Sequence, residues 1–214
     1  MQRILQAELL DSLPPGHPDA LHNRRDLRVI NRCMGNYGWF ARTLPALLRP
    51  GEAVLELGAG DGTLGMKLAA RGIPVDGLDL WPRPVAWPAA RKWHRMDLRT
   101  FADYGSYPVV AGNLIFHQFS EAELGELGAI LRRGARTIVA CEPARRRFSQ
   151  TLLATLGPLL GAGTVTRHDG PVSVAAGFRD EELPRALGLL NDAWTIHCGQ
   201  TALGALRMVA TRRS

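Results

Sequence analysis

The sequence predicts an α/β fold, in which a doubly wound, mostly parallel sheet of seven strands is preceded by helices and ends in an antiparallel hairpin. From residue 52 onward, short apolar runs alternate with segments of helical period, which is the pattern of a parallel sheet covered on both faces. The glycine-rich stretch GAGDGTLG at 58–65 directly follows the first apolar run. Two apolar segments close the chain, and its 214 residues can bury one sizeable core.

The individual elements follow from periodicity and from start and stop signals. Ser120, followed three residues later by Glu123, has the spacing of a capping box and predicts the start of a helix. Strands are expected at 52–58, 73–80, 92–97, 107–116 and 135–142, with the closing hairpin at 193–199 and 205–213. Helices are expected at 1–13, about 18–48, 62–71, 120–133, 143–160 and about 179–190. The prolines of WPRPVAWP at 81–88 exclude a regular helix there.

These elements predict one compact unit with two parts. Residues 1–50 are expected to form a helical cap over the active site, and residues 51–214 are expected to form the ligand-binding domain. The segment HDGPVSVAAGF at 168–178 has the turn signal Gly-Pro and is expected to be a loop that leads into a strand or helix.

Composition and charge narrow the class of protein. The net charge of +6 comes from the regions outside 51–131, and almost all of the cations are arginines, so a bias in composition explains it better than a nucleic-acid surface. Three distant cysteines predict neither disulfides nor a metal site, which is typical of a reducing compartment. Acidic residues near the N-terminus speak against an export signal, and glycines and a proline interrupt the longest uncharged stretch. We therefore expect a cytoplasmic protein with no membrane span.

The glycines at 58–65 fit two different ligand-binding patterns. Gly60, Gly62 and Gly65 fit G-x-G-x-x-G, the pattern of nicotinamide and flavin proteins. With Glu56 in front, Gly58, Gly60 and Gly62 fit E-x-G-x-G-x-G, which would indicate a binder of S-adenosylmethionine. The glycines alone do not decide between them, because both patterns need a sharp turn and close approach of the backbone to the ligand.

Glu56, Asp61 and Asp97 favour the second pattern, whereas Asp79 fits both. Glu56 lies inside an apolar strand, where a carboxylate is costly unless a cationic ligand group pairs with it. Asp61 lies between the glycines and would repel a pyrophosphate. Asp79, at the end of the second strand, can accept hydrogen bonds from ribose hydroxyls, or it is only a turn or cap residue. Asp97 ends the third strand and can accept from an adenine amino group, or it is a helix N-cap.

The ordered set EAVLELGAGDGTLG, VDGLDL, RMDLRTF, PVVAGNLIFHQF and RTIVACEP, over residues 52–143, resembles the motifs of class I S-adenosylmethionine-dependent methyltransferases. The closing hairpin resembles the antiparallel end of that Rossmann-like sheet. The resemblance implies that the methionine end of the cofactor meets Glu56 and the glycine loop, and that Asp79 holds the ribose. It places Leu80 or Trp81 on the adenine face and Asp97 at the adenine amino group. The cofactor-binding residues expected from it are Glu56, Gly58, Gly60, Gly62, Asp79, Leu80, Trp81, Asp97, Leu98 and Asn113.

The methyl acceptor is expected beyond the ends of the first and fourth strands. His117, in NLIFHQF, is the candidate catalytic residue, because an imidazole can take a proton near neutral pH; the alternative is that it is a pocket wall. The segments INRCMG at 30–35 and 168–178 resemble methyltransferases of the ubiquinone and menaquinone type and their secondary-metabolite relatives. That resemblance suggests an acceptor pocket, and the alternative for 168–178 is a surface turn. The pocket residues it implies are Asn31, Tyr37, His168, Asp169 and Ser173.

The sequence therefore predicts a methyltransferase that uses S-adenosyl-L-methionine, without a metal, on oxygen or carbon of a small phenolic, quinone-like or polyketide-like metabolite. An RNA-directed methyltransferase is the rival enzyme, although the D/N-P-P-aromatic motif and the catalytic cysteine of two such classes are absent at the fourth strand. A non-catalytic adenosyl-binding partner protein is the other alternative. A nucleic-acid partner is not favoured, and a homodimer is left open.

Overall fold

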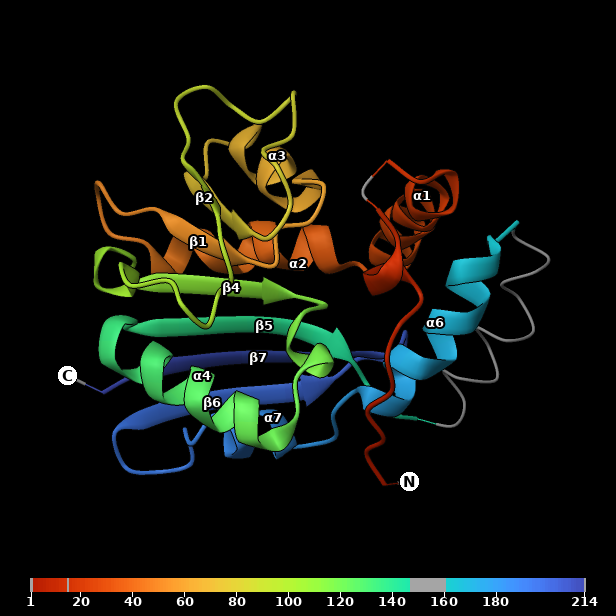
Figure 1. The fold of residues 1–214 in the computed structure, drawn as a ribbon. Coiled ribbons are helices and arrows are strands. Elements are labelled where there is room, and N and C mark those ends of the chain that lie inside the picture. Colours follow the sequence, from red (N-terminus) through yellow and green to blue (C-terminus); the bar gives the residue numbers. More distant parts are fainter. Residues whose placement is uncertain (1, 15, 147–160, 214) are drawn as a thin grey trace.

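The computed structural model describes residues 2–14, 16–146 and 161–213, and its centre is a sheet of seven strands (Figure 1). The strand order is β3-β2-β1-β4-β5-β7-β6, in which β7 runs antiparallel to both β5 and β6 and the other pairs are parallel. The strands are β1 (Val54–Leu57), β2 (Val75–Asp79), β3 (Trp93–Arg95), β4 (Val109–Asn113), β5 (Thr137–Pro143), β6 (Trp194–Gln200) and β7 (Ala205–Arg212). The predicted fold class and the closing hairpin are confirmed.

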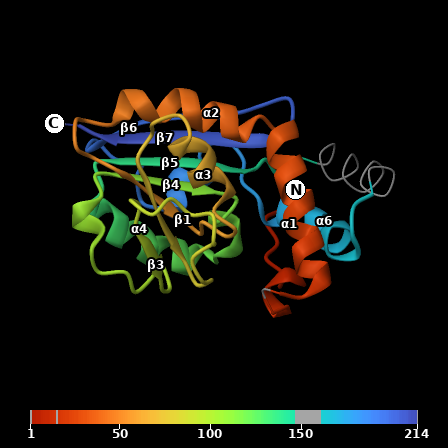
Figure 2. The same cartoon turned by 90° about the horizontal axis from the view of Figure 1, so that it is seen from above.

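Helices cover both faces of this sheet, and others lie beyond its carboxyl edge. In Figure 2, α2 lies on one side of the sheet and α4 on the other, while α1 and α6 lie together past the strand ends. The α-helices are α1 (Pro18–Cys33), α2 (Asn36–Thr43), α3 (Thr63–Ala69), α4 (Glu121–Gly134), α6 (Thr164–Ala176) and α7 (Glu182–Ala186). Short 3-10 helices are η1 (Leu10–Ser12), η2 (Leu44–Leu47), η3 (Tyr104–Ser106) and η4 (Phe116–Gln118).

Each face of the sheet has its own apolar core. On one face, Phe40 of α2 and Leu44 of η2 pack with Leu64 and Leu68 of α3 against β1. The α4 leucines and those around α7 fill the other face. Residues 1–50 therefore contribute directly to a core of the sheet as well as to the helix beyond its edge. The division into a cap and a ligand-binding domain stays a prediction.

The start of α4 has the predicted chemistry. The Ser120 side chain accepts a hydrogen bond from the backbone N–H of Glu123, and the Glu123 carboxylate accepts from the backbone N–H of Ser120. This reciprocal cap satisfies two N–H groups that a helix start otherwise leaves without partners.

The N-terminal region departs from the predicted helices in two ways. The expected helix at 1–13 is wrong for the described residues: 2–8 have no regular secondary structure, and only the short η1 follows. The backbone there bonds to distant partners instead of to itself, as when the N–H of Ile4 donates to the carbonyl of Ala175. The expected helix at 18–48 is divided at Gly35, whose φ of 69° ends α1 and starts α2.

The C-terminal half contains further corrections. Residues 168–178 were expected to begin as a loop, yet most of them belong to α6, which contains Pro171 within it. Asn23 and Asp26 of α1 bond the hydroxyl of Thr166 and so hold this helix against α1. The helix expected at 179–190 is limited to the five residues of α7. Most of the helix expected at 143–160 lies outside the described residues.

Within the described part of the chain, no helix is long and apolar enough to cross a membrane. The segment 81–88 is irregular, as its prolines predicted.

Candidate active site

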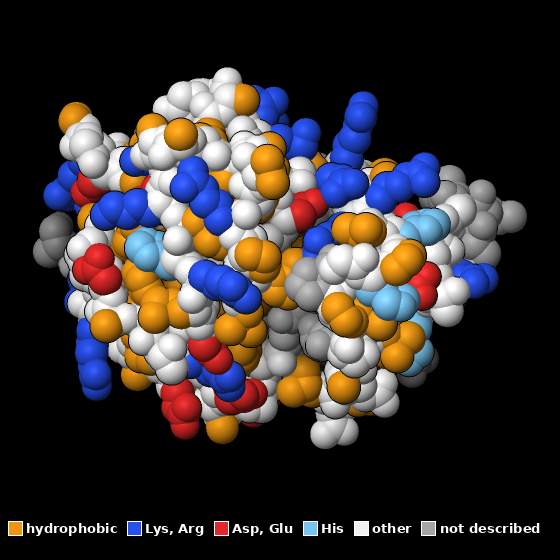
Figure 3. All heavy atoms as spheres, turned by 45° about the horizontal axis from the view of Figure 1, so that its top comes forward, with side chains coloured by type: hydrophobic (Ala, Val, Ile, Leu, Met, Phe, Trp, Pro, Cys, Tyr) orange, Lys and Arg blue, Asp and Glu red, His pale blue; other side chains and the backbone are white. Residues whose placement is uncertain are grey.

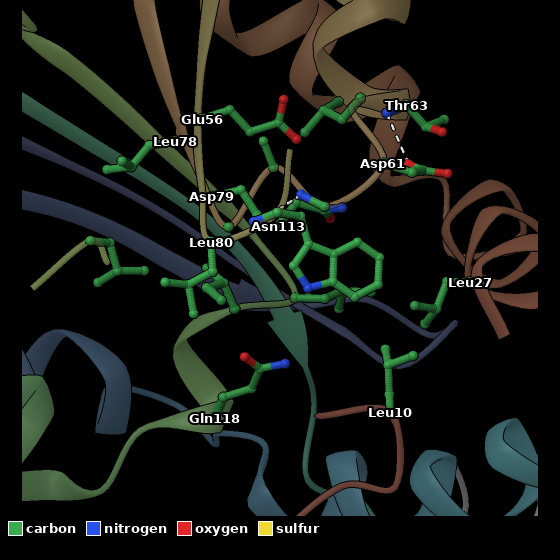
Figure 4. Close-up of a pocket in the computed structure, with 18 of the residues that line it drawn as sticks. Leu10, Leu27, Glu56, Asp61, Thr63, Leu78, Asp79, Leu80, Asn113 and Gln118 are labelled. Carbon is green, nitrogen blue, oxygen red and sulfur yellow. Dashed lines mark hydrogen bonds between the residues drawn. The ribbon is translucent and has the colours of Figure 1, made fainter. Parts of the chain in front are cut away.

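A cavity of about 530 Å³ lies where β1, β2 and β4 end, in the size range of small-molecule and cofactor sites. Figure 4 shows that Glu56, Asp79 and Asn113 reach it from three neighbouring strand ends, while Leu10 and Leu27 approach from the N-terminal region. Topology explains this meeting, because parallel strands bring their carboxyl ends to one edge, and β1 lies between β2 and β4.

Glu56 is the acidic group most deeply placed in the cavity wall. Its side chain is almost fully buried, at 4% exposed, and its Oε2 has no hydrogen-bond partner among the described residues. Burial raises the pKa of this carboxyl well above its usual range. The backbone N–H of Gly65 opposes this shift without cancelling it, and the nearby charges of Asp79 and Asp61 add to it. A buried acceptor without a partner is costly, so the site favours a ligand that brings a cationic donor.

The glycine loop meets the cavity through two of its glycines. Gly58 and Gly60 line it, both with positive φ, and the N–H of Gly60 donates to Asp79 Oδ2 at 2.7 Å. Gly62 also has a positive φ, but it packs against the Trp87 ring. A Cβ added at Gly62 would lie 2.8 Å from that ring. Gly62 is not among the residues that line the cavity, and its close contact explains the glycine by packing.

Asp79 joins the second strand to the glycine loop. Besides the bond from Gly60, it accepts a hydrogen bond from the N–H of Trp81 at 2.8 Å. Burial nonetheless raises its pKa, because it outweighs the backbone donors and the nearby charge of Arg24. The carboxylate is thus fixed by the backbone at the cavity wall, in a position to accept further donors from a ligand.

The other predicted adenine-side residues, Leu80, Trp81, Asp97 and Leu98, also line the cavity. Arg24 of α1 stacks on the Trp81 ring, with its guanidinium carbon 3.3 Å from the ring centroid. The Asp97 carboxylate is held by the guanidinium of Arg99 at 2.6 Å, and this hydrogen bond lowers its pKa.

An amide cluster forms the inner wall near β4. The side-chain amide of Asn36 donates to the side-chain oxygens of Asn31 at 2.8 Å and of Asn113 at 3.3 Å. Asn31, Tyr37 and Asn113 line the cavity. Burial raises the pKa of the Tyr37 phenol, so this group stays protonated and can only donate or accept a hydrogen bond.

His117 does not line this cavity. It is buried between two carboxylates, with Nδ1 2.7 Å from Glu142 and Nε2 3.4 Å from Glu8. Burial alone would lower its pKa, but the hydrogen bonds to Glu142 and Glu8 outweigh it and raise the pKa to about 9. An imidazole that is protonated at neutral pH has no free nitrogen to accept a proton, so this geometry does not favour the catalytic role expected from the sequence.

Comparison of the fold with solved structures finds similar chains. The plantazolicin methyltransferase BpumL, in complex with SAH, has a TM-score of 0.71 at 12% identity, over 96% of this chain and 93% of that one. Magnesium protoporphyrin IX methyltransferase from Synechocystis PCC 6803 has a TM-score of 0.58 at 20% identity, over 88% and 86%. The methyltransferase domain of a bacterial Hen1 has a TM-score of 0.58 at 12% identity, over 85% and 99%.

The fold is that of class I methyltransferases. At these identities the likeness concerns the fold, and sequence comparison adds nothing to it: no family model and no curated protein sequence matches this chain. The resemblance that the ordered motifs indicated is therefore confirmed at the level of the fold.

Within this methyltransferase fold, three residues expected in the acceptor pocket lie elsewhere. His168, Asp169 and Ser173 are on α6 and do not line the large cavity. Asp169 accepts the backbone N–H groups of Leu9 and Leu10 at 2.8 and 3.0 Å. The segment 168–178 thus binds the N-terminus of the chain.

Sequence reasoning missed the N-terminal residues that reach the large cavity. Leu10, Arg24 and Arg28 line it, and Arg28 forms an ion pair with Asp61 of the glycine loop at 2.7 Å. On the face shown in Figure 3, Lys and Arg side chains are scattered among acidic and apolar ones rather than gathered in one stripe. The arginine-rich sequence of α1 was the available signal for these residues. It does not tell which arginines face the cavity, because that depends on how α1 packs.

The described residues contain no group of three or more His, Cys, Asp or Glu side chains placed to hold a metal ion. The cavity is lined by carboxylates, amides, arginines and aromatic rings among leucines and other apolar side chains.

Proposed function

We propose that this protein is an S-adenosylmethionine-dependent methyltransferase that acts on oxygen or carbon of a small phenolic, quinone-like or polyketide-like metabolite. The observation that carries the proposal is the buried Glu56 carboxyl, whose Oε2 lacks a partner at the wall of a cavity of about 530 Å³. A cationic amino group of a ligand would supply the missing partner, and a dinucleotide pyrophosphate would not.

The other residues of the cavity fit the rest of such a cofactor. Asp79 is held by two backbone N–H groups and can accept ribose hydroxyls. Leu80 offers an apolar surface for the adenine beside the Trp81 ring, on which Arg24 stacks, and Asp97 can accept from the adenine amino group. When bound, S-adenosylmethionine supplies a methyl group that is already activated on a sulfonium. Solved structures of similar fold support this cofactor, since they contain SAM or SAH.

The chain's own task is then to bind and orient the acceptor. Among the described cavity residues, Tyr37 stays protonated, and we assign the carboxylates of Glu56, Asp79 and Asp97 to the cofactor. Asp61 pairs with Arg28, and Glu123 bonds Ser120 and Arg99. The amides of Asn31 and Asn113 can hold a hydroxyl or carbonyl without changing its charge. This arrangement favours an acceptor that ionises by itself, such as an acidic phenol or an enol, over an alcohol that needs a strong base.

Similar structures also support a small acceptor. BpumL has been solved with desmethylPZN analogues, and another neighbour is named for magnesium protoporphyrin IX. An RNA-directed enzyme and a non-catalytic adenosyl-binding protein remain the alternative functions. A cytoplasmic location and a homodimer stay predictions.

Calorimetric titration with S-adenosylhomocysteine tests the proposal, with NAD and NADP as parallel ligands. We expect binding of the first alone with a dissociation constant near the micromolar range, about −8 kcal/mol. Asp79→Ala should abolish it, because the ribose hydroxyls lose their acceptor, whereas Asp192→Ala, at an exposed position outside the cavity, should leave it unchanged. Binding of NAD in place of S-adenosylhomocysteine would contradict the proposal.

Turnover separates the enzyme from its non-catalytic alternative. Phenols, quinols and enolic polyketide mimics should convert S-adenosylmethionine to S-adenosylhomocysteine, while RNA should not. Tight cofactor binding with no transfer to any small acceptor, but with transfer to RNA, would favour the rival enzyme.

A further inference from the structure

Residues 3–13 form an N-terminal strap that runs across η4 and α6 (Figure 1). At its start, Arg3 donates from Nε to the carbonyl of Ala176 at 2.8 Å and from Nη2 to the carbonyl of Phe119 at 2.7 Å. The N–H of Ile4 donates to the carbonyl of Ala175 at 3.1 Å. The strap is therefore held by long-range bonds and has no regular structure of its own before η1.

The middle of the strap contributes a buried charge. The Glu8 carboxylate lies 3.4 Å from His117 Nε2, and the hydroxyl of Ser173 donates to it. On its other side, His117 Nδ1 lies 2.7 Å from Glu142. His117 thus links the strap to the end of β5, with side chains of Glu8, His117 and Glu142 only 11%, 4% and 0% exposed.

Glu142 also fixes the chain that follows β4. Its carboxylate accepts the backbone N–H groups of Ile115 and Phe116 at 2.9 Å and of His117 at 3.2 Å. Because Ile115 lines the large cavity, the position of the carboxylate bears directly on the cavity wall.

The far end of the strap belongs to the same cavity. Leu10 and Leu13 line it, and Figure 4 shows Leu10 approaching from the side opposite the glycine loop. Asp169 holds the N–H of Leu10, so the strap is fixed on both sides of Glu8. The part of the apolar cavity wall that Leu10 and Leu13 form therefore depends on the position of the strap.

We infer that His117 is a positioning residue: as an imidazolium between Glu8 and Glu142, it fastens the N-terminal strap and so completes the cavity wall formed by Leu10 and Leu13. We call Glu8, His117 and Glu142 together the clamp, and the contacts given above establish its geometry. Its relevance to methyl transfer rests on the proposed function.

A cavity beneath the strap gives protons a route to Glu8 and His117. A second cavity, of about 270 Å³, is lined by Glu8 and His117 together with Gln118, which also lines the large cavity. The charged or titratable groups that interact with Glu8 or His117 are Glu142 in β5 and His168 on α6. Those that interact with the neighbouring Arg3 of the strap are Glu121 at the start of α4, Glu142, Arg145 directly after β5 and Glu182 in α7.

The direction of the pH dependence follows from His117. Burial lowers its pKa, but Glu142 and Glu8 outweigh burial and raise the pKa to about 9, above the ordinary value of 6.5. Burial also opposes the ionisation of Glu8, yet the bond and charge of His117 leave the Glu8 pKa lowered. His117 therefore stabilises the strap fully below pH 6.5, and this contribution is lost as the pH rises through about 9. The contribution of Glu8 is present above pH 4.5 and is lost as the pH falls through its lowered pKa.

Hydrogen–deuterium exchange of residues 3–13 tests the inference, corrected at each pH for intrinsic exchange. In the native protein we expect strap protection to fall at least tenfold between pH 7 and pH 10. Glu8→Gln keeps the size of the side chain but removes its charge, so the strap should exchange at least tenfold faster at pH 7 and lose the pH dependence. Glu52→Gln breaks the ion pair with Arg136 away from the strap and is the matched control.

His117→Asn provides the second variant. The amide of the asparagine can still donate to Glu142, but it carries no charge and is too short to pair with Glu8. It should release the strap as Glu8→Gln does; if it fails to fold, the Glu8 variant decides alone. Native protection of the strap in Glu8→Gln, or a native protein without the alkaline transition, would overturn the inference. Titration with S-adenosylhomocysteine keeps the two proposals apart: no binding to the native protein refutes the function, whereas the exchange result bears on the clamp alone.

Discussion

Glu56 places a carboxyl group in apolar surroundings, a costly position that a ligand would make favourable. The strand around it is apolar and fully buried, and the carboxyl gains no partner for Oε2 from the described chain. The raised pKa is the expected response of a buried acid. A cationic ligand group would reverse this shift by pairing with the carboxylate.

This reversal gives a prediction for pH dependence. Binding of S-adenosylhomocysteine should release a proton from Glu56, so the affinity should rise with pH and fall by up to tenfold per unit below the pKa of the free site. Glu56→Gln should weaken binding by about 2 kcal/mol, roughly 30-fold, because a charged partner is lost. The variant should also lose the pH slope.

Calorimetry over pH 5.5–8.5, in buffers of different ionisation enthalpy, measures both the affinity and the proton release. Glu52→Gln is a suitable control, since Glu52 already pairs with Arg136 and its pKa is lowered to about 2, mainly by that hydrogen bond. An unchanged pH slope in Glu56→Gln would contradict the role of Glu56.

At the scale of elements, the connection from β1 to α3 depends on close packing. A Cβ at Gly65 would lie 2.4 Å from the Trp87 ring and 2.8 Å from Glu56 Oε2. Gly77 of β2 is similarly close to Trp93. The third glycine of the G-x-G-x-x-G match is therefore explained by an indole from the irregular segment 81–88, with no need for a dinucleotide.

Gly65→Ala should destabilise the protein by about 1–3 kcal/mol, because the added methyl forces Trp87 or α3 to shift. Gly199→Ala is the matched control: this exposed glycine in β6 has no atom within 4 Å of an added Cβ, and its effect should stay within about 0.5 kcal/mol. Urea unfolding measures both variants. Equal stability of the two variants would contradict the packing explanation.

At the scale of the whole molecule, residues 1–50 are joined to the remainder by a shared core. Phe40 and Leu44 are fully buried and pack with Leu64 and Leu68. The strap and α1 add bonds to α6, between residues that are 143 to 160 positions apart in the sequence. We therefore expect the chain to unfold as one cooperative unit.

Thermal unfolding followed by circular dichroism and by tryptophan fluorescence should give one coincident transition. S-adenosylhomocysteine at 100 times its dissociation constant should add about 2.7 kcal/mol, which raises Tm by roughly 5–10 °C for a chain of this size. Asp79→Ala should show no such rise. Two separate transitions would instead indicate that the first fifty residues form an independent cap.

Local signals in the sequence determined much of the fold. Strand and helix order, the cap at Ser120 and the closing hairpin follow from periodicity and turn chemistry, which act over a few residues. Glu56, Asp79 and Asp97 were also readable, because an acid at the end of an apolar strand reaches the same edge in any parallel sheet.

Tertiary structure alone decided the partners of the remaining site residues. His117 had the sequence signal of a base, yet Glu8 and Glu142, 109 and 25 positions away, surround it. The sequence of the strap predicted a helix. In the structure the strap instead bonds to α6 and to the end of η4. Neither outcome is encoded within one segment, because charge pairing and long-range backbone bonds depend on which elements pack together.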